Sequence, residues 1–258
     1  MLKRIAIVTG ASRLNGIGAA IARELAEAGC DLFITSWTPF DRDVYQNSRE
    51  GEPLLLLKEL QARGIRAEWM EADLSDPAIP ERIIEKVSGN FGAAPDILVN
   101  NAAYSVNKDI FELTSGDMDL HYKVNVRGTV LMCTAFAKRF SREYGGRIIN
   151  MTSGQSLGPM PGEIPYVASK GAIDALTISL SAELAPIGIT VNAVNPGPTD
   201  SGWMNRETKE HLEPMFPFGR IGQPADAARL IRFLASEEAE WITGQVIHSE
   251  GGFRRQPV

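Results

Sequence analysis

Cysteine and histidine are both scarce in this 258-residue sequence, and neither is clustered. Cys30 and Cys133 lie far apart and form no C-x-x-C pair, which favours two reduced, packed thiols over a redox or metal site. His121, His211 and His248 are equally dispersed, so we expect no histidine metal centre and no resident metal.

Long apolar runs and a one-sided charge pattern are missing as well. No window approaches the roughly 18 consecutive apolar residues of a membrane helix, and the opening MLKRIAIVTG leads directly into a strand-like pattern, leaving no room for a signal peptide. The formal net charge is −6 and the basic residues are scattered, whereas nucleic-acid binding usually needs a basic face. We therefore expect a cytoplasmic protein that neither enters a membrane nor binds nucleic acid.

Strand-like and helix-like segments alternate along the whole chain. Residues 4–8, RIAIV, form a β-branched run, the helix pattern GIGAAIARELAEAG closes on Gly29, and residues 31–36, DLFITS, indicate the next strand. Further strands are expected in IRAEWME, DILVN, GRIINMTS, GITVNAVNP and GQVIHSEGG, and helices after Pro80, around 118–144, around 166–184 and after Pro224. With 44% hydrophobic residues for a core, the pattern predicts a single α/β domain over 1–258, a Rossmann fold whose doubly wound, mostly parallel sheet has about seven strands and helices on both faces.

Two segments interrupt this alternation. Residues 37–53 are polar and turn-rich, and residues 196–217 are rich in Pro, Gly and Met. Long irregular segments are typical of functional loops at the carboxyl edge of such a sheet, where ligands bind, although solvated insertions are the alternative. We expect residues 196–217 to form a substrate loop.

The glycine-rich stretch TGASRLNGIG, residues 9–18, lies between the first strand and the first helix. Gly10, Gly16 and Gly18 could bring backbone N–H groups close to a pyrophosphate at the positive end of the helix. The spacing is not the common G-x-G-x-x-G, so the stretch alone leaves a plain glycine-rich turn open.

Tyr166 and Lys170 provide a candidate acid–base pair. They are four residues apart at the start of a helix pattern, so both side chains lie on one face. A lysine cation beside a phenol favours the phenolate and lowers a pKa that is about 10 when unperturbed, which makes the phenol a usable general acid or base near neutrality. An ordinary surface pair is the alternative.

Taken together, these residues resemble the classical form of the short-chain dehydrogenase/reductase family. Ser153 lies 13 residues before Tyr166 and 28 after Asn125, as in that family. The remaining motifs are the glycine loop, ADL at 72–74, NNAA at 100–103, VNV around Asn125, YVASK, NPGPTDS at 195–201 and the ending ITGQVIHSEGG. The resemblance covers almost the entire chain.

The resemblance implies a role for each catalytic position. Ser153 hydrogen-bonds the substrate carbonyl oxygen, Tyr166 delivers or takes its proton, Lys170 lowers the Tyr166 pKa and holds the nicotinamide ribose, and Asn125 anchors a water. A hydroxyl pair oriented in advance stabilises the charge that develops on that oxygen, while the cofactor carries the hydride. The expected cofactor contacts are Gly10, Ser12, Arg13, Gly16, Ile17, Gly18, Ser36, Asp73, Leu74, Asn101, Ala102, Ala103, Tyr166, Lys170, Pro196, Gly197, Thr199 and Ser201.

Three departures from the family pattern affect these expectations. Five residues instead of three separate Gly10 from Gly16. Enoyl reductases of the superfamily also have longer loops, but they place six residues between the catalytic Tyr and Lys, where this chain has three, so the carbonyl-reductase interpretation stands. Ala103 replaces a glycine and should shift the cofactor only slightly. Ser201 replaces a threonine and keeps the hydroxyl that could meet the nicotinamide amide.

The expected cofactor is NADP(H), with NAD(H) as the alternative. NAD-preferring relatives carry an acidic residue at the end of the second strand, but here the strand ends in FITSW. Arg13 and Ser36 could receive the 2′-phosphate instead, and Arg42 could do so if the longer loop points Arg13 elsewhere. We expect residues 37–53 to cover the adenosine end in part.

The substrate is expected to be a small carbonyl compound or secondary alcohol. A 3-oxoacyl thioester is the nearest family guess, but Ile187 stands where carrier-binding relatives often have a basic residue, so docking would rely on Lys138 and Arg139. A sugar or steroid-like alcohol stays open, as does a cofactor-binding sensor or scaffold without turnover. The candidate pocket residues are Gln155, Met160, Ile164, Trp203 and Met204. The family also implies a homotetramer built on the helices around 118–144 and 166–184 and on the C-terminal GGFRRQPV.

Overall fold

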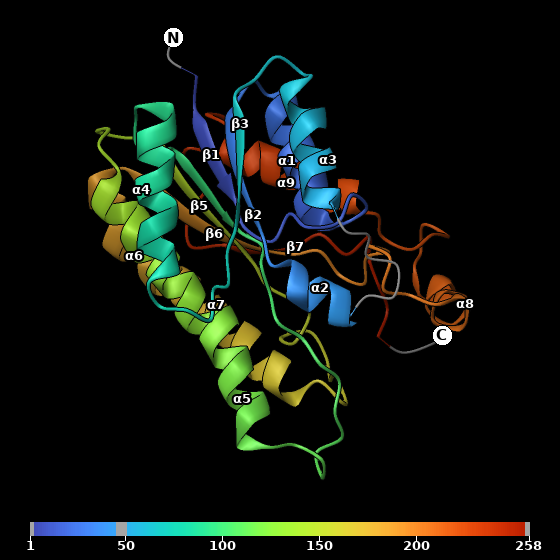
Figure 1. Ribbon diagram of the computed structural model, residues 1–258. Coiled ribbons are helices and arrows are strands. Elements are labelled where there is room, and N and C mark those ends of the chain that lie inside the picture. The colour runs from blue at the N-terminus through green and yellow to red at the C-terminus, as the bar shows by residue number, and fades with distance from the viewer. Residues whose placement is uncertain (1–2, 45–50, 256–258) are drawn as a thin grey trace.

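The computed structural model describes residues 3–44 and 51–255 and has a seven-stranded parallel sheet at its centre (Figure 1). The strand order is β3-β2-β1-β4-β5-β6-β7, and every neighbouring pair runs parallel. The strands are β1 (Ile5–Val8), β2 (Asp31–Ser36), β3 (Ala67–Glu71), β4 (Ile97–Asn100), β5 (Gly146–Met151), β6 (Ile189–Asn195) and β7 (Val246–His248). The predicted Rossmann fold and its seven parallel strands are therefore confirmed.

Helices cover both faces of the sheet (Figure 1). One layer consists of α1 (Ile17–Glu27), α3 (Glu52–Gln61) and α9 (Pro224–Ala235), and the other of α4 (Ile79–Phe91), α6 (Thr129–Arg139) and α7 (Ile164–Leu184). The shorter elements are α2 (Thr38–Val44), α5 (Ser115–His121), the π-helix η1 (Tyr122–Gly128), α8 (Arg206–Leu212) and the 3₁₀ turns η2 (Ala185–Ile187) and η3 (Glu213–Met215). Among residues 3–44 and 51–255, none of the helices could span a lipid bilayer.

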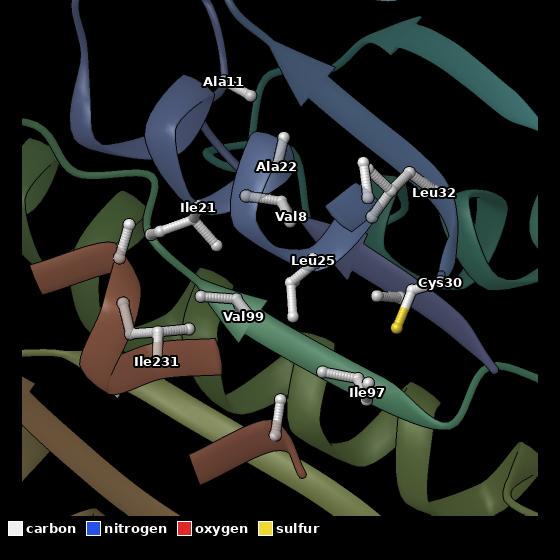
Figure 2. Packing of buried hydrophobic residues seen from close by; sticks show 14 of the residues in the cluster. Val8, Ala11, Ile21, Ala22, Leu25, Cys30, Leu32, Ile97, Val99 and Ile231 are labelled. Carbon is white, nitrogen blue, oxygen red and sulfur yellow. The ribbon is translucent and has the colours of Figure 1, made fainter. Parts of the chain in front are cut away.

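The first strand shows how the sequence pattern builds this layered core. Successive side chains of a strand point to opposite faces, so the all-apolar run IAIV serves both helix layers. Ala6 and Val8 belong to the cluster on the α1 and α9 side, where Figure 2 shows Val8 close to Ile21 and Leu25 of α1. Ile5 and Ile7 belong to the cluster on the α4 and α6 side. The unbroken apolar run thus fits a central strand buried on both faces.

Both cysteines lie inside this core. Cys30 and Cys133 are buried and unbridged, as the sequence predicts. Burial raises the pKa of the Cys133 thiol to about 12, so that thiol stays protonated and unreactive at neutral pH.

Two predicted boundaries are wrong. The helix expected around 118–144 begins earlier, passes through η1 and ends at Arg139, where Phe140 leaves the helical region with ψ 126°. The segment expected as an irregular loop over 37–53 instead forms helix α2 directly after β2 and enters α3 at Glu52, while residues 45–50 lie outside the described residues. Short helices depend on tertiary contacts more than on propensity, so local sequence signals did not reveal α2.

Candidate active site

A cleft of about 1080 Å³ opens at the carboxyl ends of the strands. It lies where the chain order reverses, because β1 pairs with β2 on one side and with β4 on the other. The predicted site residues that line it are Gly10, Ser12, Arg13, Gly16, Ile17, Gly18, Ser36, Asp73, Leu74, Asn101, Ala102, Ala103, Ser153, Tyr166, Lys170, Pro196, Gly197, Thr199 and Ser201. Asn125 alone of the predicted set lies behind the wall. The fold thus gathers into one cleft residues that span most of the chain.

The glycine loop is packed too tightly for side chains at two positions. A Cβ on Gly10, whose φ is +70°, would lie 2.7 Å from the Ala102 Cα atom. A Cβ on Gly18 would lie 2.5 Å from the Gly10 carbonyl oxygen and 2.7 Å from the Asn101 Nδ2 atom. Asn101 Nδ2 in turn donates to the carbonyls of Thr9 and Gly10 at 2.9 and 3.0 Å. The loop is therefore held against the end of β4, with its backbone turned toward the cleft.

Helix α1 begins at this loop and presents its N-terminus to the cleft. Its N-cap is Gly16, which has no side chain to cap the first N–H groups. Uncapped N–H groups at a helix N-terminus carry positive partial charge and bind anions such as phosphate. The glycine-lined approach and this helix end fit the pyrophosphate of a dinucleotide.

The wall at the end of β2 combines Arg13 with a carboxylate that the sequence reasoning missed. Arg13 donates from Nη1 to the Ser201 carbonyl at 2.6 Å, and its Nε lies 3.6 Å from Asp41 Oδ1. Burial raises the pKa of Asp41. The Ser36 hydroxyl accepts from Trp69 Nε1 at 2.8 Å. Arg13 therefore bridges the glycine loop to α2 and to the predicted substrate loop.

Tyr166 and Lys170 lie on one face of α7, as their spacing predicts, and both line the cleft. Lys170 Nζ lies 5.5 Å from the centroid of the Tyr166 ring and donates to the Met151 carbonyl at 2.8 Å. Burial lowers the pKa of Lys170 to about 8, against a smaller opposing effect of the Asp174 charge. At neutral pH the ammonium form still prevails, so a cation lies beside the phenol.

Ser153 is positioned by its neighbours on the turn after β5. Thr152 Oγ1 donates to Asp174 Oδ1 at 2.5 Å, and Gln155 Nε2 donates to Asp174 Oδ2 at 2.6 Å. The two residues that flank Ser153 and Gly154 are thus tied to one carboxylate on α7, the helix that carries Tyr166. This arrangement holds the serine and the tyrosine on adjoining walls of the same cleft.

Asn125 supports the site from inside the π-helix η1. Its side chain accepts from the Tyr104 backbone N–H at 2.7 Å and donates to the Tyr104 carbonyl and to Ser169 Oγ, both at 2.9 Å. It therefore joins the irregular segment that follows NNAA to α7. π-Helical turns inside helices often occur at functional sites, and no periodic pattern in the sequence predicts this one.

The candidate pocket residues divide into two groups. Met160 and Trp203 line the cleft. Gln155 is bound to Asp174, Ile164 lies outside the lining, and Met204 is buried with Phe216 and Ile221 in a small apolar cluster. Cleft residues that the sequence reasoning did not single out include Asp41, Tyr104, Glu163, Glu250 and Arg255. Glu163 could have been found, because it lies three residues before Tyr166 and hence close to the same helix face.

Residues 154–158, GQSLG, match the G-x-S-x-G pattern of serine hydrolases, but the surrounding structure does not. In those enzymes the serine lies on a sharp turn between a strand and a helix. Here Ser156 is exposed in a turn, does not line the cleft, and α7 begins only at Ile164. The match carries no hydrolase function.

A cleft with a glycine loop at one end and Ser153, Tyr166 and Lys170 at the other is the arrangement of an oxidoreductase with a Rossmann fold. A family model described as Enoyl-(Acyl carrier protein) reductase matches residues 10–254. The chain belongs to the short-chain dehydrogenase/reductase family.

Similar proteins and structures agree with this assignment. The chain is 53% identical over 255 residues to the uncharacterized oxidoreductase YjdA of Bacillus subtilis (strain 168), with 98% of each chain covered. It is 34% identical over 256 residues to the 3-oxoacyl-(acyl-carrier-protein) reductase FabG of Staphylococcus aureus (strain Mu50), covering 97% of this chain and 98% of that protein. A crystal structure of a short chain dehydrogenase from Burkholderia cenocepacia J2315 in complex with NADP superposes with a TM-score of 0.86 at 33% identity, covering 97% of both chains.

Proposed function

We propose that this protein is an NADP(H)-dependent oxidoreductase that interconverts a carbonyl compound and the corresponding secondary alcohol. The observation that carries the proposal is the buried Lys170 ammonium beside Tyr166 in the cleft that the glycine loop enters. Three residues between Tyr166 and Lys170 favour reduction of a carbonyl over reduction of an enoyl double bond, despite the longer glycine loop.

Two features support NADP(H) over NAD(H). The Burkholderia structure contains NADP, and β2 ends at Ser36 without a carboxylate. The nearby Asp41 carboxylate lies 3.6 Å from Arg13 Nε, so the guanidinium offsets its negative charge at this wall. We propose that the 2′-phosphate is held by Arg13 or by Arg42, the exposed residue that follows Asp41 in α2.

The protein residues divide the chemistry as follows. The Ser153 and Tyr166 hydroxyls hydrogen-bond the carbonyl oxygen, and Tyr166 delivers its proton as charge builds there. The Lys170 cation stabilises the phenolate left on Tyr166. Asn125 keeps η1 and α7 together behind the pair. Bound NADP(H) supplies the hydride, or accepts it in the reverse direction.

A 3-oxoacyl thioester is one substrate candidate, supported by the identity to FabG. Docking of an acidic carrier protein would rely on Lys138 and Arg139 in the last turn of α6, because the exposed position before Gly188 is Ile187. A smaller ketone or secondary alcohol is the other candidate.

Turnover separates an enzyme from a cofactor-binding sensor or scaffold. Purified protein is titrated with NADPH and NADH, and NADPH oxidation is then followed with a panel of ketones and acetoacetyl thioesters. We expect Tyr166→Phe to bind NADPH like the wild type and to lose at least about a hundredfold in turnover, as for the removal of a general acid. Equal rates for both proteins, or tight binding without turnover on any carbonyl, would argue against the proposal.

We also propose that the protein is a cytoplasmic homotetramer. Assembly through the helices expected at the interfaces is supported by their exposed apolar side chains. These are Met118, Leu120, Tyr122 and Ile178. Burying such a surface against another copy removes apolar area from water.

A further inference from the structure

The cations that line the cleft are engaged by oxygens of the chain itself. Lys170 donates to the Met151 carbonyl, and Arg13 donates to the Ser201 carbonyl. Arg255 is paired with Glu250, which also accepts from Asn195 Nδ2 at 2.8 Å. The charges of these walls are therefore largely satisfied before a substrate enters.

Glu163 is the exception. It is the N-cap residue of α7, lines the cleft and lies three residues before Tyr166. Within residues 3–44 and 51–255, its carboxylate makes no hydrogen bond or ion pair, and its own N-cap position is not closed by a side-chain hydrogen bond. Burial raises its pKa, and no cation among the described residues counteracts this. A half-buried acidic residue of the cleft lining thus has no partner from the described chain.

A lysine close to Glu163 in the fold has its ammonium group directed elsewhere. The Lys108 backbone N–H donates to the Gly162 carbonyl at 2.9 Å, which places this lysine beside Glu163 in the fold. Its ammonium group, however, contacts both carboxylate oxygens of Asp117, at 2.7 and 2.8 Å. Lys108 is therefore occupied, and Glu163 keeps its hydrogen-bonding capacity for a molecule in the cleft.

We propose that Glu163 selects substrates that carry a hydrogen-bond donor, a hydroxyl or an ammonium group, close to the carbonyl that is reduced. This inference rests on the proposed carbonyl reductase function and narrows its substrate class. A donor group on the substrate replaces the water that the Glu163 carboxylate loses when the cleft fills. An apolar acyl chain displaces that water but offers no hydrogen-bond donor, so the desolvated carboxylate disfavours 3-oxoacyl substrates.

The test uses ketones that differ only in a donor. Hydroxyacetone and aminoacetone match 2-butanone in heavy-atom count, and 4-hydroxy-2-butanone matches 2-pentanone, so two distances from the carbonyl are sampled. The measured quantity is the ratio of kcat/KM for the donor ketone to that for its alkyl match. Intrinsic ketone reactivity cancels when this ratio is compared between wild type, Glu163→Gln and Glu163→Leu. Glu85→Leu, at an exposed position of α4, is the matched control.

We expect the ratio to fall by roughly 10- to 100-fold in Glu163→Leu for at least one pair, with NADPH affinity unchanged, as for the loss of a hydrogen bond to a charged group. Glu163→Gln keeps an acceptor oxygen but loses the negative charge. If its ratio stays at the wild-type level for the hydroxyketones and falls for aminoacetone, a hydroxyl is the donor that the side chain can bind without its charge. The Gln variant also serves if the Leu variant does not fold.

Ratios that stay within twofold of wild type in both variants would overturn the inference while leaving the reductase intact. The inference would also be overturned if the wild type had a higher kcat/KM for acetoacetyl thioesters than for the donor ketones and Glu163→Leu did not raise this preference further. The failure of the proposed function looks different, because NADPH oxidation would then be absent with every carbonyl or equal in Tyr166→Phe.

Discussion

Replacing the buried Lys170 with methionine should change how the stability of the protein depends on pH. Lys170 is 3% exposed, and burial lowers its pKa from 10.5 to about 8. Below pH 8 the group is protonated in the folded and unfolded chains alike, so the wild type carries the full cost of a buried ammonium. Between pH 8 and 10.5 the unfolded chain binds more protons than the folded one, and the stability of the wild type rises with pH.

The size of this effect follows from the two pKa values. At about 1.4 kcal/mol per pKa unit, the shift corresponds to about 3 kcal/mol, of which about 2 kcal/mol is recovered between pH 7 and pH 9.5. Lys170→Met lacks this titration. The free energy of unfolding of the wild type minus that of the variant should therefore be about 2 kcal/mol larger at pH 9.5 than at pH 7. The comparison removes the pH dependence of all groups that the two proteins share.

Urea unfolding of the cofactor-free proteins at pH 7 and pH 9.5 measures the difference. The Tyr166→Phe background removes the neighbouring phenol, whose titration would otherwise respond to the loss of Lys170. Lys86→Met, at an exposed position of α4, controls for the loss of one positive charge. A gap between wild type and Lys170→Met that is the same at both pH values, within about 0.5 kcal/mol of error, would refute the assigned environment of Lys170.

Two further predictions concern the glycine loop and the assembly. Gly18→Ala places a Cβ 2.5 Å from the Gly10 carbonyl oxygen, so it should lower the free energy of unfolding by about 1–3 kcal/mol and weaken NADPH binding at least tenfold. Gly89→Ala is the control, because Gly89 is an exposed position of α4 with open space around it. It should raise the free energy of unfolding by about 0.5–1 kcal/mol and leave NADPH binding unchanged. Urea unfolding and NADPH fluorescence titration check both, and unaltered binding by Gly18→Ala would contradict the described packing. Sedimentation should give a tetramer, and a monomer at micromolar concentration would contradict the proposed assembly.

The sequence determined much of the fold because its signals are local. Strand periodicity, the helix pattern after Gly16 and the position of Gly29 depend on neighbours in the chain, so β1, α1 and β2 could be predicted with nearly correct bounds. The spacing of Tyr166 and Lys170 on one helix face is local too. The glycine-loop position between a strand and a helix likewise needed no tertiary knowledge.

Contacts between distant residues could not be predicted. Arg13 Nη1 donates to the Ser201 carbonyl, 188 positions away in the sequence. Asp41 reaches the same wall only because α2 folds directly after β2. Neither partner is signalled by the pattern around Arg13, since a side chain's direction depends on what packs against it.

The sequence by itself therefore determined the order of the strands, their alternation with the long helices, the parallel sheet and the helix face that carries the acid–base pair. Only the tertiary structure decided the electrostatic state of the cleft. Burial lowers the pKa of Lys170, and the Lys108 ammonium group binds the Asp117 carboxylate rather than that of Glu163. Both effects depend on which groups are removed from water and which are brought together, and these are properties of packing rather than of local pattern.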